Sequence, residues 1–189
     1  MIVMNKRIEI IGCSASGKTT LCNTLKTLGW NVIYEPFLQN PFLLKFFSGE
    51  SCGFELQMCF LLQHYNIIQS ECVASQNICD FSFALDSIYA SILLNEQEKR
   101  IYYSLYNHLI SKINKPDCLI KLTCPDSNII ERMHKRNREY ERKVDVDFLK
   151  ELNKHVMEFT ASDNLVEIDS SKIDITNADI LKKHLSHII

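Results

Sequence analysis

Short runs of apolar and β-branched residues alternate along the chain with longer segments whose apolar residues recur at helical spacing. The short runs predict five strands, at residues 7–11, 31–35, 77–80, 118–123 and 164–168. The longer segments predict helices at residues 18–28, 54–70, 84–94, 97–114, 126–138, 146–159 and 177–187. Strands that alternate with helices are typical of a parallel sheet covered on both faces. We therefore expect an α/β protein with a five-stranded parallel sheet flanked by helices.

The ends of three predicted strands carry residues that are candidates for chemistry. Residues 12–18 follow the first strand, Glu35 ends the second and Asp80 ends the third. In an open parallel sheet, ligands bind beyond the carboxyl ends of the strands. We therefore expect a substrate at this edge of the sheet.

The size and charge of the chain narrow the class of protein. Its 189 residues contain no repeat, low-complexity tract or Pro/Gly-rich linker, so we expect one domain, residues 1–189. A net charge of −2 gives no overall attraction to nucleic acid or to a membrane surface. No stretch approaches the about 18 uninterrupted apolar residues of a membrane span. We expect neither partner, and no signal peptide, because no long apolar region precedes the first strand.

Eight cysteines are spread along the chain. None forms a C-x-x-C pair, and most lie in apolar segments, where a free thiol behaves as a small hydrophobic group. We expect reduced, buried thiols and a cytoplasmic location.

Residues 12–19 read GCSASGKT and satisfy every fixed position of the Walker A pattern G-x-x-x-x-G-K-[ST]. In such a loop, backbone N–H groups surround a phosphate, Lys18 reaches the β- and γ-phosphates, and the Thr19 hydroxyl binds Mg²⁺. A chance glycine turn is the alternative, but a strand and a helix flank the pattern correctly. We expect the protein to bind ATP, or another nucleoside triphosphate, with Mg²⁺. The loop residues expected to bind it are Gly12, Ser14, Ala15, Ser16, Gly17, Lys18, Thr19 and Thr20.

Two carboxylates complete the expected surroundings of the loop. Glu35 precedes Pro36 at the end of its strand, and we expect it at the rim facing the loop rather than in an exposed turn. Asp80 ends the third strand as a Walker B-type acid would, and it is expected to hold Mg²⁺ with Thr19, directly or through water.

A basic cluster follows the fourth strand. Its members are Arg132, Lys135, Arg136, Arg138, Arg142 and Lys143. Most charge runs are solvated helical faces, but Arg132 and Arg136 share one side of a helix through their i, i+4 spacing. An RNA-binding patch is a third interpretation, disfavoured because aromatic residues apart from Tyr140 are missing from the cluster. We favour a lid that binds phosphates.

Five further segments occur in order along the chain. YEPFLQNPFLLKFF at 34–47 is similar to E-P…N-P-x-L…F-Y, and FELQMCFLLQH at 54–64 is similar to F-x-x-Q-x-x-F-L-x-x-R. DFSFALDSIYA at 80–90 is similar to a [DE]-R-S segment and its helix. PDCLIKL at 116–122 precedes ERMHKRNREYE at 131–141, which is similar to an R-x-x-x-R-x-R-x-x-E lid. With the phosphate-binding loop, these segments resemble the deoxynucleoside kinase family along nearly the whole chain.

The resemblance implies a P-loop kinase fold with an arginine-rich lid, a helix-paired homodimer, and phosphorylation of the 5′-hydroxyl of a deoxynucleoside. Glu35 would be the general base for that hydroxyl. Gln57 would hydrogen-bond the nucleobase, and Asp86 would face the edge of the base. A Gln that caps backbone groups and an Asp that merely starts a helix are the alternatives.

The resemblance also assigns the phosphate and sugar contacts. Three arginines of the lid would clamp phosphates. Arg132 and Arg136 would be catalytic residues beside Lys18, and Arg138 would bind the nucleotide. Glu141 would reach the 3′-hydroxyl of the sugar.

Three substrate-side positions depart from the family pattern. Where the [DE]-R-S segment of the family has an arginine, this chain has Phe81, so a cation near the phosphates and the general base is missing. Where the family has an arginine at the end of the helix that contains Gln57, this chain has His64. We expect this imidazole to titrate close to neutrality beside a carboxylate. Where the F-Y pair of the family has a tyrosine, this chain has Phe47, so a contact to the 3′-hydroxyl is lost.

The sequence therefore favours a kinase that transfers the γ-phosphoryl group of ATP to a nucleoside 5′-hydroxyl. Because Asp86 is an acceptor, bases that carry an amino group are expected to bind better than thymine. A catalytically weak nucleotide-binding subunit, and a kinase for a modified nucleoside or another small alcohol, are the alternatives, and Phe81 favours both.

Overall fold

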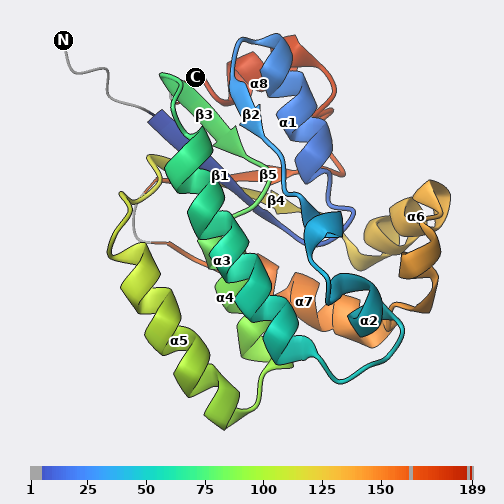
Figure 1. Ribbon diagram of the computed structural model, residues 1–189. Coiled ribbons are helices and arrows are strands. Elements are labelled where there is room, and N and C mark those ends of the chain that lie inside the picture. The colour runs from blue at the N-terminus through green and yellow to red at the C-terminus, as the bar shows by residue number, and fades with distance from the viewer. Residues whose placement is uncertain (1–5, 162–163, 187, 189) are drawn as a thin grey trace.

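A parallel sheet runs through the centre of the computed structural model, which describes residues 6–161, 164–186 and 188 (Figure 1). The strands are β1 (Lys6–Gly12), β2 (Asn31–Ile33), β3 (Gln76–Cys79), β4 (Cys118–Thr123) and β5 (Leu165–Asp169). They lie in the order β2-β3-β1-β4-β5, and every pairing is parallel. The expected five-stranded parallel sheet is confirmed, with the first strand at its middle.

Helices cover both faces of the sheet. The α-helices are α1 (Lys18–Thr27), α2 (Leu43–Phe47), α3 (Gly53–Glu71), α4 (Phe83–Leu93), α5 (Glu96–Ile110), α6 (Asp126–Arg136), α7 (Val146–Glu158) and α8 (Ala178–His184). Two 3-10 helices, η1 (Phe37–Gln39) and η2 (Glu139–Lys143), join them. Helices α1 and α8 pack on one face, while α3, α4 and α7 cover the other and α5 lies outside α3 and α4 (Figure 1).

The alternation of side chains along β1 explains the two layers. Ile8 and Ile10 point into the core beneath α1 and α8, whereas Ile11 joins the core beneath α4 and α7. Glu9, on the same side as Ile11, is buried and accepts hydrogen bonds from Arg7 Nε at 3.0 Å and from the Phe83 backbone N–H at 3.3 Å. The middle strand therefore helps to fix where α4 begins.

Most predicted elements have the expected positions, but several ends differ. β4 has the predicted bounds, and β2 stops at Ile33 rather than at residue 35. α5 ends four residues early, at Ile110, and α6 ends at Arg136 because Asn137 adopts a left-handed backbone with φ of 48°. α8 ends at His184, and the predicted end of this helix at His187 lies outside the described residues.

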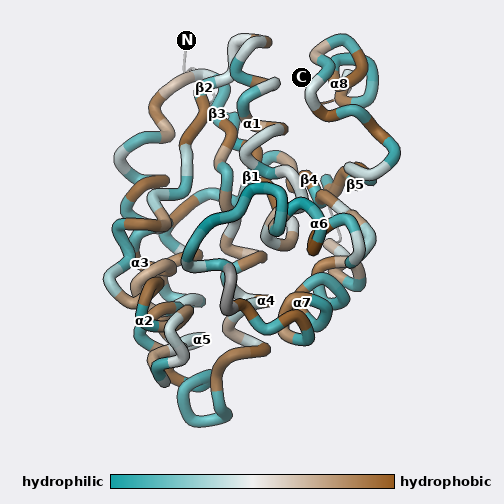
Figure 2. The backbone as a smooth tube through the Cα atoms, turned by 90° about the vertical axis from the view of Figure 1, so that its right-hand side faces the viewer, coloured by the Kyte–Doolittle hydropathy of each residue, from teal (hydrophilic) through white to brown (hydrophobic). Residues whose placement is uncertain are grey.

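The short helices α2, η1 and η2 are not in the prediction, because three to five residues carry too little periodicity. Figure 2 shows α6 and the segment after it as a mostly hydrophilic stretch, in keeping with the expected lid. Among the described residues, no helix has the length and apolar character needed to cross a membrane.

Candidate active site

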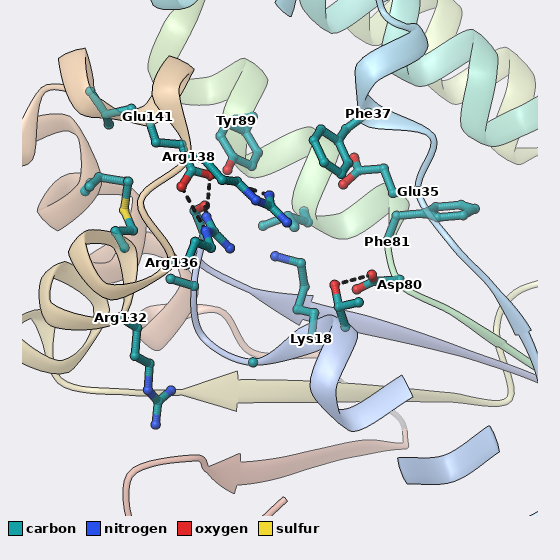
Figure 3. A pocket seen from close by; sticks show the side chains of 18 of the residues that line it. Lys18, Glu35, Phe37, Asp80, Phe81, Tyr89, Arg132, Arg136, Arg138 and Glu141 are labelled. Carbon is teal, nitrogen blue, oxygen red and sulfur yellow. Dashed lines mark hydrogen bonds and ion pairs between the residues drawn. The ribbon is translucent and has the colours of Figure 1, made fainter. Parts of the chain in front are cut away.

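A cavity of about 640 Å³ opens at the carboxyl ends of the strands. It is lined by the loop after β1, the ends of β2 and β3, and residues from α2, α3, α4 and α6 (Figure 3). The expected site residues that line it are Ser14, Ala15, Gly17, Lys18, Thr19, Thr20, Glu35, Phe47, Gln57, His64, Asp80, Asp86, Arg132, Arg136, Arg138 and Glu141. Gly12 and Ser16 are not part of the lining, since Gly12 ends β1 and Ser16 is fully buried under the loop.

The phosphate-binding loop needs glycine at two positions. A Cβ atom on Gly12 would lie 2.4 Å from the Ser16 hydroxyl, so a side chain cannot fit there. Gly17 has φ of 110°, and a Cβ on it would lie 2.6 Å from Cδ1 of Ile175. The two glycines therefore let the loop close tightly before the N-terminus of α1, an arrangement that binds anions.

Lys18 begins α1 and points into the cavity (Figure 3). Its Nζ atom donates hydrogen bonds to the carbonyl oxygens of Gly12, at 2.9 Å, and Cys13, at 3.3 Å. The ammonium group is thus held across the mouth of its own loop, within reach of a bound phosphate.

Thr19 and Asp80 face each other across the gap between α1 and β3. The Thr19 hydroxyl donates a 2.6 Å hydrogen bond to Oδ2 of Asp80. Burial raises the pKa of Asp80 to about 6, against the lowering influence of Lys18 and Thr19. The other oxygen, Oδ1, is buried and has no hydrogen-bond partner among the described residues. A carboxylate and a hydroxyl are oxygen ligands of the kind that Mg²⁺ prefers, so the pair fits this ion.

The lid brings two cations over the loop. Arg136 donates to Oε2 of Glu141 at 2.8 Å, to its Oε1, and to the Ser14 hydroxyl at 3.0 Å. Arg138 lies 3.7 Å from Oε1 of Glu141 and stacks 5.0 Å from the ring centre of Phe37. Figure 3 shows Lys18, Arg136 and Arg138 pointing toward one space.

Arg132 points away from the other three cations (Figure 3). Its guanidinium donates to the Ser16 carbonyl at 3.1 Å and to the Ser170 hydroxyl and carbonyl at 3.0 and 2.8 Å. The residue expected as a phosphate clamp therefore links α6 to the loop and to the end of β5. Its contact with a phosphate stays a prediction.

The enclosed end of the cavity holds the remaining polar residues. Gln57 on α3 is buried and lines the wall. His64, seven residues further along the helix, is 2.8 Å from Oδ2 of Asp86 through Nδ1 and 3.3 Å from Oε1 of Glu35 through Nε2. Asp86 is thus adjacent to the expected position of a base edge, but one of its oxygens is occupied by His64.

The protonation of His64 differs from the expectation. Burial lowers the pKa of this imidazole, but Asp86 and Glu35 together raise it to about 10. The expected titration close to neutrality is wrong, because two carboxylates face the ring rather than one. His64 is a charged group across the physiological range.

Aromatic residues that the sequence analysis did not single out form much of the wall. Phe37, Tyr89, Tyr140 and Phe148 all line the cavity. Tyr140 of the lid packs against Phe47 at 5.5 Å and Phe37 at 6.3 Å between ring centres. The place of Tyr89 in the wall could have been predicted from the sequence, because a residue three positions after Asp86 lies on the same face of the helix. No sequence pattern indicated the contact between Tyr140 and Phe37, which are about a hundred residues apart in the sequence.

Comparisons with known proteins agree with this geometry. A family model described as deoxynucleoside kinase matches residues 8–187. The chain is 28% identical over 152 residues to a deoxyguanosine kinase of Bacillus subtilis, covering 77% of this chain and 73% of the relative. It is 29% identical over 161 residues to a deoxyadenosine kinase of Dictyostelium discoideum, covering 80% and 65%.

A solved structure resembles the whole fold. Deoxyadenosine kinase from M. mycoides, bound to dCMP and a flexible dCDP as products, superposes with a TM-score of 0.85 at 22% identity, covering 96% of this chain and 100% of that one.

Proposed function

The chain belongs to the deoxynucleoside kinase family, and from this premise we propose that it transfers the γ-phosphoryl group of ATP to the 5′-hydroxyl of a deoxynucleoside. One observation carries the proposal. A single cavity contains the phosphate-binding loop with Lys18, the Thr19–Asp80 pair, and Glu35 near the buried amide of Gln57. A phosphate donor and a nucleoside acceptor can therefore meet in this cavity.

The donor end of the cavity is built for a triphosphate. The loop N–H groups and Lys18 bind the β- and γ-phosphates, while Arg136 and Arg138 of the lid stabilise the charge that spreads over the transferred group. Ile175, next to Gly17, belongs to a segment after β5 that lines the same end of the cavity.

Thr19 and Asp80 would hold Mg²⁺, and Oδ1 of Asp80, which has no hydrogen-bond partner among the described residues, would be the oxygen available for it. When bound, the ion neutralises charge on the β- and γ-phosphates. Two protein ligands suffice, because Mg²⁺ keeps water and phosphate oxygens as its remaining ligands.

At the acceptor end, Glu35 accepts the proton of the 5′-hydroxyl as that oxygen forms its bond to the γ-phosphorus. The bond between this phosphorus and the bridging oxygen of ADP breaks in the same step, and ADP takes the electron pair. Gln57 and the second oxygen of Asp86 hydrogen-bond the base, and Glu141 binds the 3′-hydroxyl after exchanging part of its contact with Arg136.

A panel of nucleosides tests the proposal. Wild-type protein is mixed with ATP and Mg²⁺, and ADP release is followed with deoxyadenosine, deoxyguanosine, deoxycytidine and thymidine. Nucleoside-dependent ADP release, with a 5′-monophosphate as second product, is the expected result. Tight ATP binding with no release for any nucleoside favours instead the nucleotide-binding subunit that Phe81 suggested.

Three wider properties are part of the same proposal. Ile101 on α5 is an exposed apolar residue, about half of whose surface is accessible, and we propose that α4 and α5 pair with a second copy in a homodimer. Light scattering at micromolar concentration tests this, and a monomeric mass would contradict it. We further propose a single domain, supported by the one sheet that all five strands form, and a cytoplasmic location, supported by cysteines that are mostly buried, as reduced thiols often are.

A further inference from the structure

His64 lies between two carboxylates at the enclosed end of the cavity. Nδ1 is 2.8 Å from Asp86, whereas Nε2 is 3.3 Å from Oε1 of Glu35 without the alignment of a hydrogen bond. The His64 side chain is 1% exposed, so water does not compete for either nitrogen. The imidazole therefore connects the expected general base to a buried anchor.

Two aromatic rings fix the plane of this imidazole. Phe81 stacks on it with ring centres 4.1 Å apart and an angle of 12° between the planes. Phe60 lies at 5.7 Å and 30°. With its plane set by the rings and its rotation set by Asp86, the direction of Nε2 toward Glu35 is determined before any substrate arrives.

The ring also supplies a charge that Phe81 does not. Its pKa of about 10 keeps His64 protonated at neutral pH, with both nitrogens as donors. In the part of the chain that the structure describes, the ion pair of Glu35 is with His64. A phenylalanine at 81 provides the stacking surface on which this cation rests.

We propose that His64 is the positioning residue for Glu35, and that Phe81 and Asp86 hold it in that role. The imidazole fixes Oε1 of Glu35, which leaves Oε2 directed to the 5′-hydroxyl of the acceptor. This inference rests on the proposed function and adds to it how Glu35 is aligned. It also predicts that His64 acts on turnover rather than on recognition of the base.

A double-mutant cycle tests the proposal with His64→Gln, Glu35→Gln and the two together, and with His155→Gln on the exposed face of α7 as the matched control. We expect His64→Gln to lower kcat by about 10- to 100-fold, because misplaced reacting groups cost rates of this order. KM for ATP and for the nucleoside should stay within about twofold. When His64→Gln is added to Glu35→Gln, kcat should fall almost no further, because the carboxylate that His64 positions is already absent. His64→Arg, which keeps a cation between the two carboxylates, should recover part of the loss.

Several outcomes would overturn the proposal. One is an unchanged kcat in His64→Gln, and another is a raised nucleoside KM at constant kcat. The third is a kcat of the double variant that is lowered by the product of the two single effects. If His64→Gln does not give a cooperative melt, Phe81→Leu takes its place in the cycle, because it removes the ring that fixes the imidazole plane and leaves Asp86 unchanged.

A measurement without turnover separates this inference from the proposed function. In protein labelled with ¹⁵N-histidine, Glu35→Gln should shift the Nε2 resonance of His64, while Glu71→Gln at the exposed end of α3 should not. An unmoved resonance overturns the contact whether or not the wild-type protein phosphorylates a nucleoside. Inactive wild-type protein with the expected shift contradicts the proposed function alone.

Discussion

The Arg132 guanidinium donates a 3.1 Å hydrogen bond to the carbonyl oxygen of Ser16, at the centre of the phosphate-binding loop. The same side chain holds Ser170 at the end of β5, so it connects α6 with two segments around the donor end of the cavity. The lid is therefore fastened to the loop at its base, while Arg136 and Arg138 extend over the cavity.

Replacing Arg132 should affect both stability and nucleotide binding. Arg132→Ala is expected to lower the free energy of unfolding by about 1.5–3 kcal/mol, the usual range for a lost hydrogen bond to a charged group. It should also weaken ATP binding, because the loop carbonyl loses its support. Urea unfolding and ATP titration measure the two effects, with Lys182→Ala on the exposed side of α8 as control. Normal stability combined with a lowered kcat would identify Arg132 as a phosphate clamp instead.

Lys18 is expected to act on the phosphates of the donor. Lys18→Ala should lower kcat by about 10²-fold or more, as losing one preorganised donor to a developing charge typically does. Affinity for ATP should fall as well, since its Nζ lies across the loop in the free protein. Steady-state kinetics and ATP titration give both numbers. Lys26→Ala, on the exposed last turn of the same helix, should change neither.

Glu35 should matter to turnover and not to donor binding. Glu35→Gln keeps the shape of the side chain and removes its basicity, so kcat should drop by about 10²–10⁴-fold. ATP affinity should stay as in the wild type, because Glu35 follows β2, whereas the loop follows β1. Single-turnover kinetics with saturating ATP decide the matter, with exposed Glu55→Gln as control. A normal kcat would remove Glu35 from the mechanism.

The charge of His64 predicts a pH dependence of stability. Its pKa in the folded protein, about 10, lies above the ordinary value of 6.5. The stabilisation is therefore complete below about pH 6.5 and is lost as the pH rises toward 10, with a slope of up to about 1.4 kcal/mol per pH unit. Urea unfolding between about pH 6.5 and 8.5 should show this slope, and His64→Gln should flatten it. Equal slopes in the two proteins would assign it to other groups.

The free oxygen of Asp86 predicts the order in which bases bind. An exocyclic amino group donates to this acceptor, whereas the carbonyl of thymine faces it acceptor to acceptor, at a cost of about 1–3 kcal/mol. Deoxyadenosine, deoxyguanosine or deoxycytidine should therefore compete better than thymidine in equilibrium binding. Asp86→Ala should narrow the difference. Tighter binding of thymidine, with an order that Asp86→Ala leaves unchanged, would contradict the base assignment.

The sheet and the loop were predictable because their information is local. The apolar run at 118–123 has turn residues before it, and GCSASGKT carries its own geometry in its glycines. Lys18, Thr19 and Asp80 meet because parallel strands end at one edge, a rule that needs only strand positions.

The connections across the site were not predictable in this way. Arg132 and Ser170 are 38 residues apart, and helical spacing alone placed Arg132 on one side with Arg136. For His64, the resemblance indicated one neighbouring carboxylate, but packing between Phe60 and Phe81 turned the ring to face two. Such outcomes depend on tertiary packing, which a residue pattern does not record.

The central place of β1 has a consequence for biosynthesis. Of the five strands, this one is made first, yet its partners in the described sheet are β3, which begins at Gln76, and β4, which begins at Cys118. Until those segments emerge, Ile8, Ile10 and Ile11 have no sheet partner and form an apolar segment open to wrong pairing. We expect the nascent chain to need shielding by a chaperone until β3 and β4 have been made.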